Sequence, residues 1–482
     1  MFDMRPTAYV IGLMVAALGA TMSVPLAIEI YDGNGQWWVF AISMAITCGC
    51  GVATSIGTSG SATGRLTLQQ TFLLTTGVWL ILPIFAAIPF IIGATNARVV
   101  DAFFEAMSGL TTTGATVFTG LDELPRGLLF WRAMMQWFGG IGIVVVAMVF
   151  LPVLRVGGMQ IFRSEGFDTF GKVLPRAAEI ARRISVIYVG LTITCMIAYR
   201  IMGLGFYDAL YHALTTISTG GFSSHDASFG AFKGGAEYVA CAFMVASALP
   251  FVRFVQLLDG SAKPMLVDAQ IRGFFAAFAG VVVVIGAYLV LLSGRDLEIS
   301  LREALFNVAS IMTGTGYAST DYQLWGPLPV AVFFLIGLVG GCAGSTSCSV
   351  KIFRYQILFT SIATQIRRLH SPNGVFKARF SGRPVSDEVI ASVIAFFTLF
   401  FVTLAVLAVA LGMTGLDMVT AVSGAASALA NIGPGLGPII GPAGTFAEIN
   451  DTAKWLLAFG MLIGRLELMA VFVLFTANFW RP

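Results

Sequence analysis

Four short stretches of the sequence bring glycine together with threonine, serine or asparagine, residues that could supply oxygen ligands to a cation. The residues that carry the pattern are Thr112, Thr113 and Gly114; Ser218, Thr219 and Gly220; Thr315, Gly316 and Tyr317; and Asn431, Ile432 and Gly433. A ring of backbone carbonyls can replace the water around a cation without placing full negative charge in an apolar medium. Glycine accepts the backbone angles that such a ring requires. The pattern therefore indicates cation coordination.

A half-length apolar segment precedes each glycine turn, at residues 101–113, 207–219, 302–315 and 417–431. About a dozen residues make roughly 18 Å of helix, about half a bilayer, so we predict four re-entrant helices. An acidic residue near each start suits the positive end of the helix dipole. These residues are Asp101, Asp208, Glu303 and Asp417, which stand 13, 12, 13 and 16 residues before Gly114, Gly220, Gly316 and Gly433. The partly negative helix ends would then favour a cation at the turns.

Ten long apolar runs surround these segments, near residues 8–30, 37–57, 70–93, 128–151, 184–202, 236–258, 273–293, 327–359, 389–412 and 454–479. The chain is 57% hydrophobic and 11% charged, whereas a soluble domain carries about 25% charged residues. We predict an all-α integral membrane protein with two N-terminal transmembrane helices and four membrane-pore-loop-membrane repeats in a pseudo-fourfold arrangement. The helix pair would span residues 1–66, and the repeats 67–155, 156–260, 261–360 and 361–482.

The distribution of basic residues predicts the orientation. If both termini are cytoplasmic, fifteen Lys and Arg fall in inside loops, Arg65, Arg155, Arg163 and Lys172 among them, against seven outside. The positive-inside rule favours this arrangement, which also places Arg481 inside. No run of basic residues forms a solvated face, so no nucleic-acid partner is expected.

The eighth apolar run contains a second candidate site, the stretch from Gly340 to Ser349. Its candidate residues are Gly340, Gly341, Gly344, Ser345, Thr346 and Ser347. Glycine and hydroxyl residues weaken a helix, so the stretch could be an unwound loop below the turns, whose hydroxyls and carbonyls bind or block a cation. Close helix packing through small residues is the alternative. Arg465 lies in the last apolar run, where an ionisable group indicates a functional role. The alternative is a side chain that extends to the membrane interface.

These residues resemble the membrane subunit of Trk/Ktr-type potassium uptake systems, which are related to plant HKT transporters. The similarity covers roughly residues 60–482, and the two extra N-terminal helices are typical of the TrkH branch. It rests on the four turns, on Gly340–Ser349 and on the stretch from Gly464 to Glu467. The sequence departs from the pattern at its fourth turn, where Ile432 replaces threonine.

The resemblance implies a K⁺ selectivity filter at the four turns and a gate made by the glycine-rich loop with Arg465. It implies K⁺ as the bound and transported ion, with Na⁺ or Rb⁺ as possible alternatives, and no covalent cofactor. It also implies a homodimer in the lipid of a bacterial cytoplasmic membrane, and a cytoplasmic nucleotide-binding regulatory subunit as partner.

Two other classes of function compete with this interpretation. An H⁺- or Na⁺-coupled potassium symporter also uses broken helices and repeats, but such repeats are often inverted and carry titratable groups at the midplane. An enzyme would need a convergent nucleophile, acid–base pair or metal cluster, and the sequence offers none. Six cysteines without disulfide-scaffold spacing and three histidines make a transition-metal site unexpected.

Overall fold

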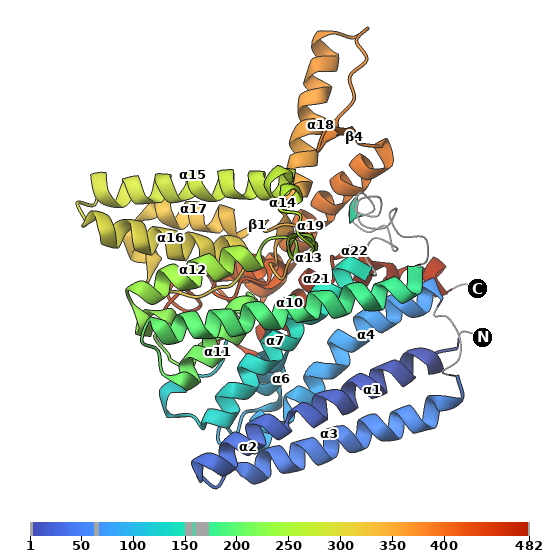
Figure 1. Cartoon of the computed structure of the whole chain (residues 1–482), viewed down its shortest axis with the longest axis vertical. Coiled ribbons are helices and arrows are strands. Elements are labelled where there is room, and N and C mark those ends of the chain that lie inside the picture. The colour runs from blue at the N-terminus through green and yellow to red at the C-terminus, as the bar shows by residue number, and fades with distance from the viewer. Residues whose placement is uncertain (1–2, 62–66, 150–157, 160–172, 481–482) are drawn as a thin grey trace.

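The computed structural model describes residues 3–61, 67–149, 158–159 and 173–480, and it is mostly helical (Figure 1). The first half contains α1 (Arg5–Thr21), α2 (Ser23–Asp32), α3 (Trp37–Thr58), α4 (Leu68–Ala86), α5 (Ile88–Ile92), α6 (Val99–Leu110), α7 (Arg126–Val149), α10 (Val173–Ile201), α11 (Phe206–Ile217), α12 (Gly235–Ser247) and α13 (Phe251–Leu258). The second half contains α14 (Lys263–Val267), α15 (Ala269–Leu291), α16 (Leu297–Thr313), α17 (Pro327–Gly337), α18 (Ile352–His370), α19 (Asp387–Met413), α20 (Met418–Ala430), α21 (Asp451–Arg465) and α22 (Met469–Phe472).

Seven helical segments in the described part of the chain are long and apolar enough to cross a membrane, and two bent pairs would bring the number to nine. Large apolar side chains cover their outer faces: Ile56, Val283 and Val406 are 70%, 65% and 64% exposed. A surface of this kind is costly in water and suits lipid. The chain is therefore an all-α membrane protein, as its composition predicts.

Three of the ten predicted crossings differ from simple helices. The sixth bends by 92° between α12 and α13, and the tenth bends by 105° after α21. The eighth stops at Gly337 and resumes at Ile352, so the alternative of a continuous helix packed through small residues is wrong. Beyond that break, α18 and the strands β3 (Arg379–Phe380) and β4 (Arg383–Pro384) project away from the other helices (Figure 1).

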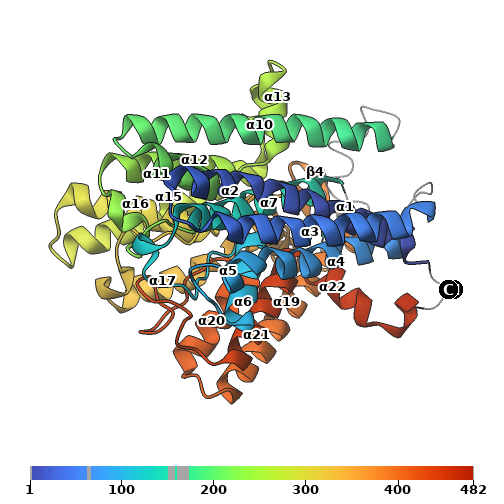
Figure 2. The same cartoon turned by 90° about the horizontal axis from the view of Figure 1, so that it is seen from below.

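Four short helices, α6, α11, α16 and α20, occupy the positions of the predicted re-entrant segments. They are 12, 12, 17 and 13 residues long, and α16 begins five residues before its predicted start because Asp296 caps it from outside that range. Their C-terminal turns are buried almost completely. In Figure 2, α10 lies along one side of the protein, and α20 and α21 lie at the opposite side.

The division of the chain into an N-terminal pair and four repeats remains a prediction. Its boundaries at 66/67 and 155/156 touch residues outside the described ranges, as do Arg65, Arg155, Arg163, Lys172 and Arg481 of the orientation argument.

Candidate cation pathway

The four turns after the short helices share one backbone conformation. In each, an amide returns to a carbonyl five residues earlier: Thr113 N to Ser108 O, Gly220 N to Thr215 O, Thr315 N to Ser310 O and Ile432 N to Ser427 O, at 2.8 to 3.0 Å. The residue before that amide has a positive φ in every case, at Thr112, Thr219, Gly314 and Asn431. These shared features set the register of the four turns without reference to residue type.

The structural register corrects the sequence alignment at the second turn. Gly221, with φ 76°, is the counterpart of Gly114, Gly316 and Gly433, whose φ values are 83°, 81° and 108°. The predicted marker Gly220 instead occupies the position of Thr113, and Ser218 that of Thr111. The sequence contained a signal for this, because Asp208 stands 13 residues before Gly221, the same spacing as at the first and third turns.

The four glycines bring neighbouring turns into direct backbone contact. A Cβ at Gly114 would overlap the carbonyl oxygen of Gly220, one at Gly221 that of Thr315, and one at Gly316 that of Ile432. A Cβ at Gly433 would lie 2.7 Å from the carbonyl oxygen of Thr113, which closes the circuit. We call these four carbonyls, of Thr113, Gly220, Thr315 and Ile432, the carbonyl ring.

A hollow of about 260 Å³ opens on one side of the ring. Gly114, Gly221, Gly316 and Gly433 all line it, whereas Gly220 does not. Its wall also carries Arg132, whose guanidinium pairs with buried Glu105 at 2.8 Å. His225 and Asp226 lie at its rim, where the hydrogen bond with His225 lowers the pKa of the Asp122 carboxyl.

Side chains behind the turns hold the carbonyls in place. Ser310 donates to Tyr317 O at 2.7 Å, and its counterpart in the fourth turn, Ser427, donates to Gly433 O at 2.8 Å, one position earlier in the shared register. Asn431 donates to the Thr113 hydroxyl at 2.9 Å, which joins the fourth turn to the first.

The side chains of Tyr317 and Ile432 point away from the ring. The Tyr317 hydroxyl bonds Thr215 and lies 3.3 Å from the Thr216 hydroxyl, in the second short helix. The Ile432 side chain packs toward Gly337 at the end of α17. Replacement of threonine by Ile432 therefore changes the packing behind the fourth turn while its carbonyl stays in the ring.

The second turn has a distinct support, Gln136 of α7. Its amide nitrogen lies 2.5 Å from Gly220 O, and its amide oxygen accepts a bond from Phe222 N at 3.0 Å. A Cβ at Gly220 would overlap the Gln136 side chain. Gln136 thus fills the space that a side chain at position 220 would need.

The stretch of residues 340–349, which we call the glycine-serine loop, lies against the ends of all four short helices. Cys348 Sγ is 3.5 Å from the Thr112 hydroxyl, and a Cβ at Gly314 would lie 3.1 Å from the Cys348 Cβ. Thr346 donates to Ile217 O at 3.1 Å, and Ser349 N to Ala430 O at 2.9 Å. The loop therefore covers the face of the turns opposite the 260 Å³ hollow.

The loop is pinned to its own backbone and to the α12–α13 bend. β1 (Val339–Gly340) and β2 (Val350–Lys351) pair at its base, where Gly340 leaves no room for a Cβ beside Cys348 O. Gly341 fits against Ala248, and Phe251 N donates to Gly344 O at 2.9 Å. The Ser345 hydroxyl donates to Cys342 O at 2.6 Å, and the Ser347 hydroxyl accepts from Gly341 N at 2.9 Å. These hydroxyls hold the loop in shape.

Arg465, at the end of α21, contacts the loop directly. Its guanidinium lies 2.7 Å from Cys348 Sγ and 3.1 Å from Gly139 O, and the side chain is only 4% exposed. Glu467 bonds Arg354 rather than Arg465. A small cavity of about 40 Å³ beyond the loop is lined by Cys348, Lys351, Arg354, Arg465 and Glu467, among others. It has room for about one water molecule.

Comparison with known proteins identifies the architecture. The sequence model of the TrkH family, described as a cation transport protein, matches residues 41–481. The chain belongs to the TrkH family. It is 41% identical over 482 residues to the Trk system potassium uptake protein TrkI of Halomonas elongata, covering 99% of this chain and 97% of that protein. It is 32% identical to the Trk system potassium uptake protein TrkG of Escherichia coli, with 99% of each covered.

The crystal structure of the potassium transporter TrkH from Vibrio parahaemolyticus superposes with a TM-score of 0.92 at 33% identity and covers 100% of both chains. The resemblance drawn from the motifs is thus confirmed. The relatives are named as uptake proteins and transporters, which agrees with the prediction that this TrkH-family protein is not an enzyme.

Motif reading missed three features of this TrkH-family protein. Gln136 carries no signal, because its contact with Gly220 spans 84 residues of sequence. Cys348 carries no local signal for its role, yet it contacts both Arg465 and Thr112. Glu105 and Arg132 could have been found, since an acid and a base within apolar segments indicate a buried pair.

Proposed function

We propose that this protein carries K⁺ into the cell through the carbonyl ring, with the glycine-serine loop and Arg465 as its gate. The observation that carries the proposal is the closed circuit of four equivalent glycine–carbonyl contacts, one from each turn, with the loop lying against all four. Both similar proteins above are named as potassium uptake proteins.

The ring supplies the chemistry that a dehydrated cation needs. Backbone carbonyls contributed by four turns replace water, and the C-terminal ends of the four short helices add negative potential at the same place. Rejection of anions follows from this geometry, and we assign the preference for K⁺ to the same carbonyl ring. The membrane potential would supply about 2.3 kcal/mol per charge for each 100 mV.

The loop and Arg465 form the barrier in the proposal. A guanidinium held beside Cys348 places a positive charge next to the loop on the side away from the hollow, where it repels an arriving cation. Opening requires the loop to leave the turns. We assign that movement to a cytoplasmic nucleotide-binding regulatory subunit, acting on a homodimer whose termini are cytoplasmic and which lies in the bacterial inner membrane.

Coupling to H⁺ or Na⁺ is the alternative mechanism. A symporter needs a titratable group on the path. Among the described residues that line the small cavity, the acidic one is Glu467, and it is already paired with Arg354. His225 and Asp226 line only the rim of the hollow, outside the ring and the loop. Passive, potential-driven movement is therefore the mechanism we propose.

Reconstitution in liposomes tests the proposal. Potential-driven Rb⁺ uptake by the purified chain should be reduced by K⁺ more than by Na⁺ or Li⁺, and should need no proton gradient. Gly316→Ser should abolish that preference. Uptake that appears only with an imposed H⁺ or Na⁺ gradient would overturn the passive mechanism. An unchanged preference for K⁺ in Gly316→Ser would show that the carbonyl ring is not the selectivity filter.

A further inference from the structure

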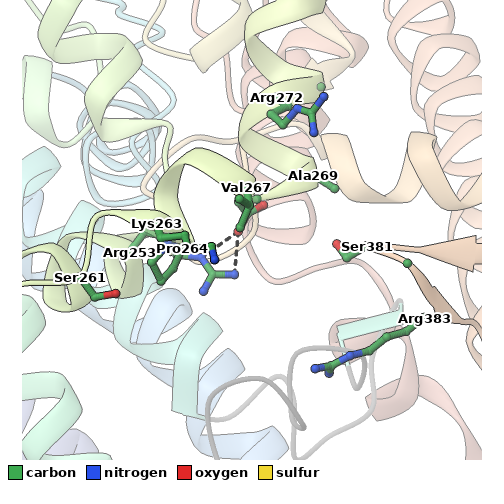
Figure 3. Close-up of a pocket in the computed structure, with 12 residues that line it drawn as sticks. Arg253, Ser261, Lys263, Pro264, Val267, Ala269, Arg272, Ser381 and Arg383 are labelled. Carbon is green, nitrogen blue, oxygen red and sulfur yellow. Dashed lines mark hydrogen bonds and ion pairs between the residues drawn. The ribbon is translucent and has the colours of Figure 1, made fainter.

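One cavity among the described residues lies outside the ion pathway. It measures about 940 Å³ and is bounded by α13, α14, the start of α15 and the β3–β4 turn (Figure 3). This is the side of the protein that we propose to be cytoplasmic. Its volume falls within the range of small-ligand sites.

Four basic side chains surround this cavity against one carboxylate. Arg253 is held by Asp268 at 2.8 Å and by Gln256 at 3.0 Å. Lys263, Arg272 and Arg383 also line the cavity, and none of the three forms an ion pair with another described residue. Figure 3 shows Lys263 and Arg383 on opposite sides of the open space. Cations gathered around one space repel each other unless an anion lies between them.

The lining favours phosphate among the possible anions. Arginine and lysine together bind phosphate oxygens from several directions, arginine by paired N–H groups and lysine as a point charge. The Ser261 and Ser381 hydroxyls and two glycines, Gly273 and Gly382, add donors and room for a close approach.

The walls of the cavity also hold the glycine-serine loop. The Asp268 carboxylate caps α15 through Gln270 N at 2.8 Å, and the Gln270 side chain accepts a bond from Ala343 N at 2.9 Å. On the opposite wall, α13 carries Arg253 and begins at Phe251, whose amide donates to Gly344 O. A ligand that draws Arg253 toward itself would act on α13, which holds Gly344. A ligand that draws α15 toward itself would act on Gln270, which holds Ala343.

We propose that this cavity binds a phosphate-bearing anion, a lipid headgroup or a soluble phosphate compound, and that binding changes the stability of the closed glycine-serine loop. The second half of the proposal rests on the gate role given to the loop above, whereas the binding half does not.

Binding is tested with the purified full chain in nanodiscs. One arm adds inorganic pyrophosphate to nanodiscs of phosphatidylcholine, and the other replaces part of that lipid by phosphatidylglycerol; the change in Tm reports binding in each. The variant Lys263→Ala/Arg383→Ala removes two exposed cations from the cavity. Arg367→Ala/Lys377→Ala removes two exposed cations from α18 and its following loop as a matched control.

We expect the cavity variant to bind about 30-fold more weakly and the control to bind as the unchanged protein does, at about one kcal/mol per basic residue. A Tm response to pyrophosphate identifies a soluble ligand, and a response to phosphatidylglycerol alone identifies a lipid. Equal losses in both variants, or no response in the unchanged protein, would overturn the site.

Coupling is tested by Rb⁺ uptake into liposomes with and without the anion that binds. The rate should change severalfold in the unchanged protein and stay constant in the cavity variant, whose basal uptake remains because neither residue touches the ring or the loop. Absence of selective uptake by the unchanged protein would count against the proposed function and leave the nanodisc result standing. Binding without any change in rate would overturn the coupling.

Discussion

The carbonyl ring and the glycine-serine loop lie against each other, yet they are built in opposite ways. The ring takes one equivalent backbone position from each of four turns and joins them through four glycine contacts. The loop comes from one place in the chain and depends on side chains, such as Thr346 and Arg465, that have no counterparts in the other turns. In the function proposed above, the repeated positions coordinate the cation equally, whereas the loop that blocks it comes from one repeat and is not symmetric.

The strongest test of the comparison places a methyl group in the ring. Gly221→Ala would force a Cβ into the Thr315 carbonyl at a positive φ, at a cost of about 1–3 kcal/mol. We expect discrimination between K⁺ and Na⁺ in Rb⁺ uptake assays to fall by about 10- to 100-fold. Gly415→Ala is the control, because Gly415 also has a positive φ but open space around it. Equal effects in both variants would show that strain alone, and not the ring, is responsible.

The next test removes the charge behind the loop. Arg465→Ala should raise uptake in the absence of any partner protein by about tenfold, since coupling energies of this kind are typically 1–3 kcal/mol. Selectivity should stay unchanged, because the ring is intact. Arg465→Lys keeps the charge and should stay nearly closed. A loss of selectivity in the alanine variant would mean that ring and loop are not separable.

A smaller effect is expected from Gln136→Ala, which removes two hydrogen bonds from the second turn only. At about 0.5 kcal/mol for each of the two bonds, the lower end of the usual range, selectivity should decline about fivefold. Gln323→Ala is a matched control, because Gln323 makes the same pair of bonds to Gly437 outside the ring. If the two variants behave alike, Gln136 supports folding in general and not the ring.

The smallest effect concerns pH at the rim of the hollow. The hydrogen bond with His225 lowers the pKa of Asp122 in the folded protein, so its contribution is present above the unfolded pKa and is lost as pH falls through the lowered value. At pH values above about 4, Asp122→Asn should therefore reduce the free energy of unfolding by less than about 1 kcal/mol and lower Tm slightly. In stronger acid the variant should match the unchanged protein. A difference that grows on acidification would contradict this assignment.

Much of the fold could be predicted from the sequence, because lipid demands long apolar helices and short ones are conspicuous between them. The bends are harder to predict. Pro250, which directly precedes α13, is a local signal for the first bend. The 105° bend after α21 depends on Glu467 and Leu468, both at positive φ, and nothing in their residue types requires it.

The four glycine turns could be predicted from the sequence, but the register of the second turn could not. Two adjacent glycines, Gly220 and Gly221, fit the second turn equally well by residue type, and only the distance to Asp208 separates them. Contacts such as Gln136 with Gly220 and Arg465 with Cys348 join distant parts of the chain. They depend on how helices pack, which local patterns do not report.

The bond between Asn431 and Thr113 has a consequence for how the protein is made. It joins residues 318 positions apart, and ribosomes add about 5–20 residues per second, so the first turn waits roughly 16 to 64 s for its last neighbour. During that interval its polar groups lie in a partly assembled membrane segment, where the Thr111 and Thr113 hydroxyls can bond each other at 2.7 Å. The last helices to leave the ribosome thus complete the carbonyl ring that the first turn begins. A chain truncated before the fourth turn cannot form this ring.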